Sequence, residues 1–459
     1  MLKTFVNLVT LAGMVVTASH AQGLPDQLNF SRSNIEGPHI YGVSINSAYS
    51  TYDFRSANGT SSTGLPARTS YGASVTAGWQ RFHGKTNFSV RYTGGYNGNS
   101  YITRRDSFQH SLYATMTRTL GRKWTFNLSA SGLIADLSQS IFEPSNLVLL
   151  AQSGAAFDDL AASQSIGQFS SAQNGLILSG GAGTPATRAI LLGNRVPAYN
   201  LDVGLSYAHS SRLTFSIGSF ALGGQQRSND PVKNVMQVYN MPRTIGGMAN
   251  VSMSYSLSPR TSLSLGVAQT YTSTRYQKNM GTSPQVGLGR KMGKHWFLRG
   301  TAGAFVTENN RQSVGAPPRT QATWGGALGF QTRSHAFLAS YDRSGQMIAD
   351  AASTVGRNTI YRGAWSWHPN RRGWAFHANY SHTGTGGSGF VTLSESQAGA
   401  GLNRNLGWNL KLSFNYAYLI SNLNYFGLGN QVSINSGRVS LGWTPRLHRE
   451  RQGVLDDDQ

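Results

Sequence analysis

The stretch Tyr71-Gly72-Ala73-Ser74-Val75-Thr76-Ala77-Gly78-Trp79-Gln80 alternates an apolar side chain with a small or polar one along its whole length. Side chains on a strand alternate between two faces, so this period of two predicts a strand with one apolar and one polar face. His83-Gly84-Lys85 then separates it from a second alternating run that contains Phe88, Val90 and Tyr92. The two runs therefore predict an antiparallel hairpin closed by a tight turn.

The same pattern recurs along the chain and predicts eighteen strands, joined alternately by long polar loops and by turns of three to six residues. The predicted strands are residues 40–54, 69–82, 86–96, 107–119, 124–137, 198–209, 213–222, 244–257, 261–276, 283–291, 295–307, 320–331, 336–341, 359–367, 374–382, 391–402, 408–420 and 431–443. We expect an all-β, up-and-down antiparallel barrel with both termini on the side of the short turns. A further hairpin in 176–192 would give twenty strands, and loss of two short strands would give sixteen.

The first 21 residues have the pattern of a secretory signal peptide. Lys3 precedes an apolar run from Phe5 to Val16, and Ser19-His20-Ala21 forms a small-x-small cleavage site. The predicted organisation is a signal peptide over 1–21, a short periplasmic segment over 22–38, a transmembrane barrel over 39–443 and a periplasmic tail over 444–459.

The composition agrees with a single membrane barrel. Only 12% of the 459 residues are charged, 39% are hydrophobic and none is cysteine, whereas an average soluble domain carries about 25% charge. No segment reaches the roughly 18 consecutive apolar residues of a membrane helix. A transmembrane strand needs no such run, because its lipid-facing residues occupy alternate positions.

Tryptophan marks one predicted membrane boundary. Eight of the nine tryptophans fall close to a predicted short turn or to the end of the last strand, and the exception is Trp324: Trp79, Trp124, Trp296, Trp365, Trp367, Trp374, Trp408 and Trp443. Indole rings favour the interface between hydrocarbon and headgroups, so these eight predict a periplasmic girdle. The predicted outer girdle is Tyr49, Tyr52, Tyr96, Tyr271, Tyr276, Tyr380 and Tyr418.

The formal net charge of +21 is also distributed unevenly. Every predicted short turn carries a basic residue and none carries a carboxylate: Lys85, Arg122, Lys123, Arg212, Arg260, Lys294, Arg333, Arg371, Arg372 and Arg404. Such a ring predicts contact with anionic outer-membrane lipids. The cations are spread around a rim and form no basic groove with interleaved aromatics, which argues against nucleic-acid binding.

Together, the leader, the alternating strands, the sorted loops and the aromatic girdles resemble the Gram-negative outer-membrane β-barrel superfamily, and the size is similar to its porins. The resemblance implies a location in the outer membrane and contact with the barrel-assembly machinery during biogenesis; a homo-oligomer stays open. One departure is that sixteen residues follow Trp443, the aromatic residue that would end such a barrel.

The inward phase of the strands predicts the chemistry of a pore. Its charged residues are mostly basic: Arg91, Arg299, Arg362, His377, Lys411 and Arg438, against Asp202, Asp342 and Glu395. A net positive wall favours anions, although the same arginines could instead brace the barrel by pairing with carboxylates. The loop over 138–197, with Asp158 and Asp159, is predicted to fold inward as a constriction, and the alternative is a cap outside the pore.

Catalytic and metal-binding patterns are weak. The eleven histidines are scattered without ligand spacing, and His110, in the lipid-facing phase near the outer rim, has no serine beside it. We therefore expect no catalytic residue, no metal and no cofactor. The predicted function is a diffusion channel for small hydrophilic solutes with a mild anion preference, and the alternative is a structural or adhesive barrel that acts through its surface loops.

Overall fold

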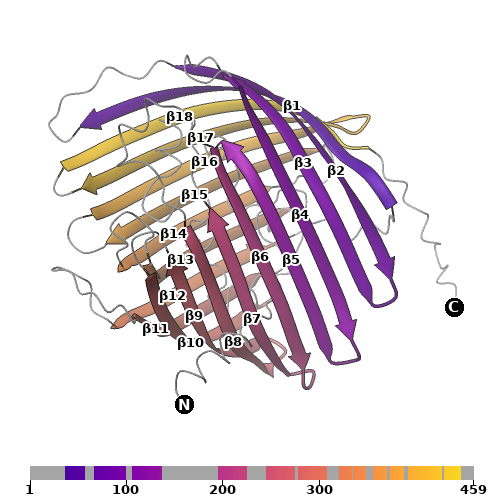
Figure 1. The fold of residues 1–459 in the computed structure, drawn as a ribbon, viewed down its shortest axis with the longest axis vertical. Coiled ribbons are helices and arrows are strands. Elements are labelled where there is room, and N and C mark those ends of the chain that lie inside the picture. The colour runs from indigo at the N-terminus through magenta and orange to yellow at the C-terminus, as the bar shows by residue number, and fades with distance from the viewer. Residues whose placement is uncertain are drawn as a thin grey trace.

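The computed structural model describes residues 37–56, 67–99, 106–136, 195–224, 244–273, 278–307, 320–332, 334–347, 355–367, 369, 373–386, 391–425 and 428–445. Within these ranges the chain forms eighteen strands (Figure 1). They are β1 (Gly37–Ser56), β2 (Arg68–His83), β3 (Thr86–Asn99), β4 (Asp106–Leu120), β5 (Trp124–Asp136), β6 (Arg195–Ala208), β7 (Leu213–Gly224), β8 (Thr244–Ser258), β9 (Thr261–Ser273), β10 (Lys278–Met292), β11 (Trp296–Thr307), β12 (Thr320–Gln331), β13 (His335–Met347), β14 (Val355–Trp367), β15 (Trp374–Gly386), β16 (Val391–Gly407), β17 (Leu410–Tyr425) and β18 (Leu428–Trp443).

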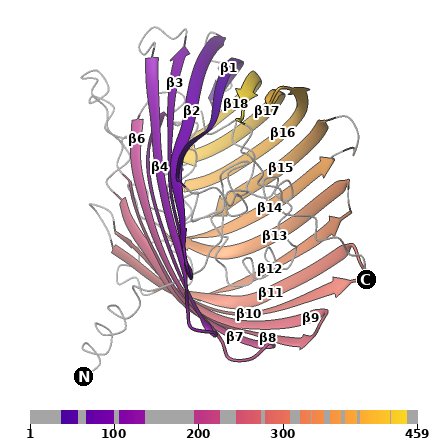
Figure 2. The same cartoon turned by 90° about the vertical axis from the view of Figure 1, so that its right-hand side faces the viewer.

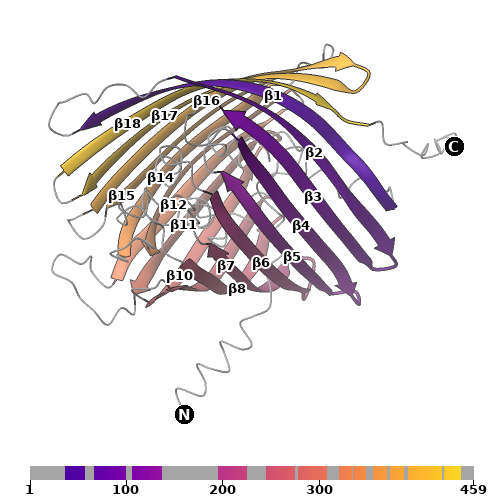
Figure 3. The same cartoon turned by 45° about the horizontal axis from the view of Figure 1, so that its top comes forward.

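The sheet closes into a barrel. Each strand pairs antiparallel with its sequence neighbour, and β1 pairs with both β2 and β18. Figures 1, 2 and 3 all place β1, in indigo, beside β18, in yellow. The predicted fold, an eighteen-stranded up-and-down antiparallel barrel, is confirmed.

The wall has a wet inner face and an apolar outer face, and β11 shows the alternation most clearly. Phe297 and Arg299 are buried, with exposed fractions of 5% and 4%. Trp296, which precedes them, and Leu298, which lies between them, are 44% and 45% exposed. Leu, Ile, Val and aromatic side chains dominate the exposed positions of the strands. An apolar exterior of this kind is suited to lipid and not to water.

The tight turns lie on one side of the barrel, as the sequence predicts. Glycines with positive φ begin or end several of them, for example Gly84 (φ 54°), Gly121 (φ 77°) and Gly293 (φ 68°). The β16–β17 turn departs from the prediction: its central residues are Trp408 (φ 49°) and Asn409 (φ 64°), a two-residue hairpin with left-handed backbone. Arg404, expected in this turn, lies instead inside β16.

The strand count of eighteen is right, but some predicted boundaries are wrong. The direct pairing of β5 with β6 leaves no place in the ring for a further hairpin. Strand β13 continues to Met347, well beyond the predicted end at residue 341. Strand β17 ends at Tyr425 and strand β18 begins at Leu428. Only two residues therefore separate them where a long loop was expected. Polar residues on both faces of these strand ends concealed the strands in the sequence.

Several expectations fall on residues that the structure does not describe. These are the signal peptide over 1–21, most of the segment over 22–38, whose last two residues begin β1, the loop residues Asp158 and Asp159, and the tail beyond Pro445. The basic residues Arg333, Arg371 and Arg372 also lie outside the described ranges.

We predict that Gly303 on β11 tolerates no side chain. A Cβ built there would meet the backbone carbonyl oxygen of Pro284 and would lie 2.9 Å from Cγ of Gln285. Gly303→Ala should therefore lower the free energy of unfolding by about 1–3 kcal/mol. The measurement is urea unfolding of the refolded barrel in phospholipid vesicles, followed by tryptophan fluorescence.

Gly300 on the same strand is the control, because a Cβ there has nothing within 4 Å. Gly300→Ala should leave the free energy of unfolding within about 0.5 kcal/mol of the parent value. Equal losses for both variants would contradict the pairing of β10 with β11.

Candidate functional site

The candidate site is the inner wall of the barrel, and the structure places all eight predicted pore-lining residues on it. They are spread over eight strands: Arg91 on β3, Asp202 on β6, Arg299 on β11, Arg362 on β14, His377 on β15, Glu395 on β16, Lys411 on β17 and Arg438 on β18. Arg91, Arg299, Asp202 and His377 are each at most 8% exposed. The other four alternate with outward residues in their own strands, for example Arg362 beside Tyr361, which is 46% exposed.

Two arginines share one row across β11 to β14. Arg299 stands opposite Ala327, Ala327 opposite Ser340, and Ser340 opposite Arg362. Neighbouring strands lie about 4.8 Å apart, so the backbones of the two arginines are about 14 Å apart along the wall. Small side chains occupy the two positions between them, which leaves both guanidinium groups facing the same inner surface.

A row of acids lies next to these arginines, two residues nearer the long-loop side. Asp342 stands opposite Ile360, Ile360 opposite Thr383, and Thr383 opposite Glu395. Asp342 interacts electrostatically with Arg362. On the wall of β13 to β16, the acidic side chains therefore lie nearer the long loops and the basic row lies nearer the short turns.

A second cluster lies on the facing wall. Arg91 on β3 stands directly opposite Tyr113 on β4. It interacts electrostatically with Tyr113 and with Tyr41 on β1, and Tyr113 in turn interacts with Asp202 on β6. In a ring of eighteen, β3 and β12 are nine strands apart, so this cluster faces the Arg299–Arg362 row across the barrel.

His377 and Arg438 share a third row, nearer the short turns. His377 stands opposite Gly401, Gly401 opposite Asn415, and Asn415 opposite Arg438. The imidazole of His377 lies where a Cβ of Gly401 would be, so glycine at 401 makes room for the ring. Lys411 lies still closer to the short turns, opposite Gly442.

The sequence interpretation missed several inner-wall residues, among them Tyr113, Lys291 and Tyr41. Lys291 faces inward opposite the buried Phe297, in phase with Gly287 and Gly289, but it stands at the end of its predicted strand and was not assigned a face. Tyr41 was missed for another reason: the register of β1 shifts between Ile40 and Gly42. A bulge reverses the phase of alternation, and the sequence carries no sign of it.

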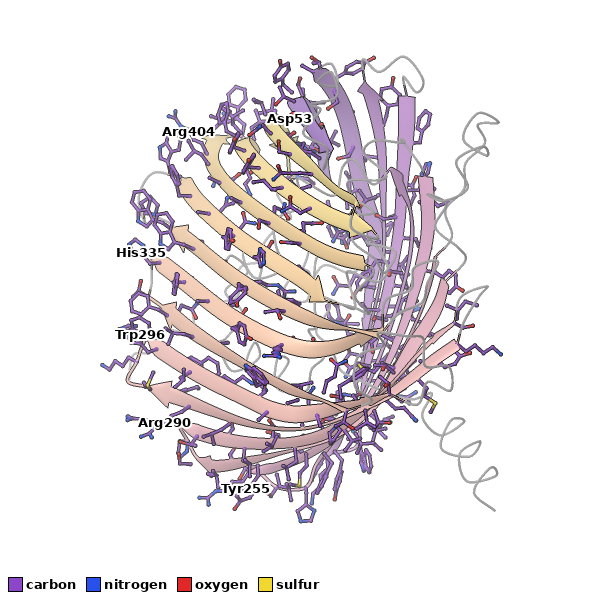
Figure 4. All side chains as sticks on the ribbon, turned by 90° about the vertical axis from the view of Figure 1, so that its left-hand side faces the viewer. Asp53, Tyr255, Arg290, Trp296, His335 and Arg404 are labelled. Atoms are coloured by element: carbon purple, nitrogen blue, oxygen red, sulfur yellow. The ribbon has the colours of Figure 1, made fainter. Side chains whose placement is uncertain are left out.

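The aromatic residues near the short turns lie on the outer wall. Trp124, Trp296, Trp365 and Trp443 are between 37% and 44% exposed, and rings of neighbouring strands contact some of them, as in Trp124–Tyr207 at 4.5 Å and Trp296–Phe330 at 4.7 Å. Trp79, Trp367 and Trp374 occupy the same strand ends. Figure 4 shows Trp296 with Arg290, His335 and Arg404 along one rim. Trp408 differs from this group, because it is 87% exposed at the tip of its turn.

Of the tyrosines expected in the outer girdle, one position lies on the inner phase of its strand and another lies outside the described ranges. Tyr52 stands opposite Ile434, whose side chain is fully buried, so position 52 belongs to the inner face. Tyr276 lies outside the described ranges. Tyr71, which was not predicted, is 56% exposed on the outer wall and pairs across strands with position 47.

In the described ranges no three His, Cys, Asp or Glu side chains are close enough to hold a metal ion. His110 faces outward, and its Nδ1 lies 2.7 Å from the hydroxyl of Tyr92. No helix among the described residues is long and apolar enough to cross a membrane.

Comparison with known proteins gives structural likeness only. No family model matches the sequence, and no curated protein matches it. The solved structures that resemble it include OccAB4 of Acinetobacter baumannii, with 10% identity, 89% of this chain and 98% of that chain covered, and a TM-score of 0.43. OpdQ of Pseudomonas aeruginosa has 12% identity, covers 88% and 97%, and has a TM-score of 0.43.

The outer membrane protein opdK of Pseudomonas aeruginosa is similar at 11% identity, over 87% of this chain and 99% of that chain, with a TM-score of 0.42. Scores at this level assign neither a family nor a solute to this chain.

The wall itself predicts how thiol reagents should react. The native chain has no cysteine, so single cysteines report one position each. Thr301 faces the inside and Ala302 the outside of β11, since their partners are Gly325 and the half-exposed Trp324. In vesicles, a charged maleimide should label Thr301→Cys at least about tenfold faster than Ala302→Cys, because thiolate forms readily only in water.

The control is a lipid-soluble maleimide, which should label Ala302→Cys. Faster labelling of Ala302→Cys by the charged reagent would contradict the assignment of the two faces.

The outward apolar face and the closed ring of eighteen strands together make this chain a closed antiparallel β-barrel whose outer surface is suited to lipid.

Proposed function

We propose that the protein is an outer-membrane channel for small hydrophilic solutes with a preference for anions. The observation that carries the proposal is the excess of cations on the inner wall. Among the described side chains, Arg91, Lys291, Arg299, Arg362, Lys411 and Arg438 face inward, with His377, against Asp202, Asp342 and Glu395.

The size of the ring supports a channel. A barrel of eight strands is filled by its own side chains, whereas sixteen to eighteen strands leave room for water. Ser, Thr, Asn and Gly also separate the charged residues along the inner face, for example Ser340, Ser381 and Thr383. Hydroxyl and amide groups of this lining can form hydrogen bonds with hydrophilic solutes.

The arrangement of charge supports the preference for anions. Arg91 and the Arg299–Arg362 row lie on facing walls, so a solute between them meets positive charge on both sides. Charges in a narrow aqueous path bounded by a low-dielectric wall act over longer distances than in bulk water. Asp342 and Glu395 on one wall and Asp202 on the other offset part of this potential, which suits a mild preference rather than exclusion of cations.

The loop between β5 and β6, with Asp158 and Asp159, remains our proposed constriction, and it lies outside the described ranges. The alternative function, a structural or adhesive barrel, depends on surface loops, and no described residue favours it. Contact with the assembly machinery and a homo-oligomeric state remain predictions.

The direct test is the current through the purified mature protein in a planar bilayer, with the reversal potential measured under a potassium chloride gradient. We expect stable single-channel conductance and a reversal potential of the sign given by chloride permeation. A barrel that is folded but does not conduct would overturn the channel, and a cation-selective reversal potential would overturn the anion preference.

Neutralising the arginine row should reduce the preference. In Arg299→Gln/Arg362→Gln the ratio of chloride to potassium permeability should fall about twofold or more, because two of the cations that set the potential are lost. The measurement is the reversal potential in the same salt gradient.

Arg290→Gln is the matched control. Arg290 belongs to β10, one strand from Arg299, but it is exposed on the outer face. Its loss should leave the permeability ratio unchanged. An equal change in the control would show that net charge, and not the inner wall, determines selectivity.

A further inference from the structure

One outward cation lies away from the short-turn rim that Arg290 and Arg404 occupy. Arg343 of β13 points outward, where its guanidinium carbon lies 4.1 Å from the ring centre of Trp324 on β12. Trp324 is 39% exposed on the lipid-facing surface and is also the one tryptophan that does not belong to the girdle near the short turns. The outward arginine and the tryptophan that lies away from the short turns therefore contact one another.

The depth of Arg343 makes it costly. It lies six residues beyond Phe337, which belongs to the aromatic rows near the short turns. At about 3.3 Å per residue and a tilt of about 40°, six residues rise about 15 Å, within an apolar band about 25 Å tall. The equivalent position on β6, six residues from Tyr207, is Leu201, which is 43% exposed.

Among the described residues, no carboxylate lies beside this cation on the outer wall. The outward positions of β12 to β15 contain no carboxylate in the described ranges, and Asp342 lies on the opposite face of the sheet. Within the described part of the chain, Nε of Arg343 is buried without a hydrogen-bond partner. Ionisable residues at membrane depth are costly and usually have a function.

Polar groups continue from Arg343 across three more strands of the outer wall. Thr359 stands directly opposite it on β14. One step nearer the short turns, the ring centres of Tyr341 and Tyr361 are 5.0 Å apart, those of Tyr361 and His382 are 5.8 Å apart, and Nδ1 of His382 lies 2.8 Å from the hydroxyl of Ser396. Cation, hydroxyl, imidazole and aromatic faces thus adjoin at the long-loop side of the apolar band.

We propose that Arg343, supported by Trp324 and adjoined by Thr359, His382 and Ser396, binds the phosphate of a lipid headgroup in the extracellular leaflet. Stacking on an indole holds the guanidinium plane while its N–H edge stays available, and that edge matches two phosphate oxygens. The long side chain can reach up to the headgroup from a backbone within the band. The acyl chains of the same lipid would pack on the small residues below, such as Ala339 and Gly363.

The test is retention of lipid by the folded protein, measured by native mass spectrometry from micelles that contain phosphatidic acid or phosphatidylcholine. The native protein should retain phosphatidic acid, which carries a phosphomonoester, in preference to phosphatidylcholine. Arg343→Leu should lower this retention about five- to tenfold, as expected for loss of one cation at a headgroup. Retention of phosphatidic acid by Arg343→Lys should lie between that of the native protein and that of Arg343→Leu. An ammonium group keeps the positive charge but cannot donate two parallel hydrogen bonds to the phosphate as a guanidinium does.

Lys278→Leu is the control, because Lys278 is an exposed cation at the long-loop end of β10, three strands from β13. It should retain phosphatidic acid as the native protein does. Heat-modifiable gel mobility confirms that each variant is folded, and Arg343→Lys keeps the test valid if the leucine variant is not.

Three outcomes would overturn the proposal. Equal retention by the native protein and Arg343→Leu would show that the residue does not bind lipid. Displacement of the lipid by an equal concentration of inorganic phosphate would assign the site to a free ion. A change from oligomer to monomer in Arg343→Leu, with lipid retention unchanged, would assign the surface to a second copy of the chain.

Discussion

Closure of β1 on β18 is the constraint on which the rest of the structure depends. Inside a membrane, each backbone N–H and C=O group needs a partner in the protein, because there is no water to provide one. Fourteen residues of β1, from Val43 to Ser56, stand opposite residues of β18, and this ladder removes the only free edges that an eighteen-stranded sheet would have. Hydroxyl groups reinforce the seam, since Ser50 and Ser436 form a hydrogen bond across it inside the barrel.

Closure also gives the wall its two chemistries. Successive side chains of a strand point alternately into and out of the barrel. Charged residues that occupy only the inward positions therefore all face the lumen. The ring then brings residues that are far apart in sequence to face one another, such as Arg91 on β3 and Arg299 on β11. The electrostatic character of the lumen is thus a property of strand order, because the inward acidic and basic residues named above lie on ten different strands, one on each.

The outer wall is mostly apolar, and a few polar residues interrupt it. Over β5 to β10 its exposed residues include Leu201, Val251 and Leu288. Over β13 to β16 polar groups come closer to the short turns, and Arg343 is among them. A channel requires nothing of that surface, so the departure points to a role toward the membrane. The exposed indole of Trp408 is a second departure, for which the described residues supply no partner.

The sequence by itself determined the fold class, the number of strands and the faces of the predicted inner-wall residues, because period-two alternation is a local property that each strand carries alone. It could not determine where strands end beyond the membrane, because residues such as Asn422 and Asn430 are polar on both faces and look like loop. The bulge near Ile40 also escaped it, since one extra residue reverses the phase without changing composition. Only the tertiary structure decided which charges are neighbours. Asp342 and Arg362 are twenty residues apart in sequence and meet because their strands pair, and Trp324 meets Arg343 for the same reason. Register between strands is set by the closed ladder as a whole, and no single stretch of the chain contains it.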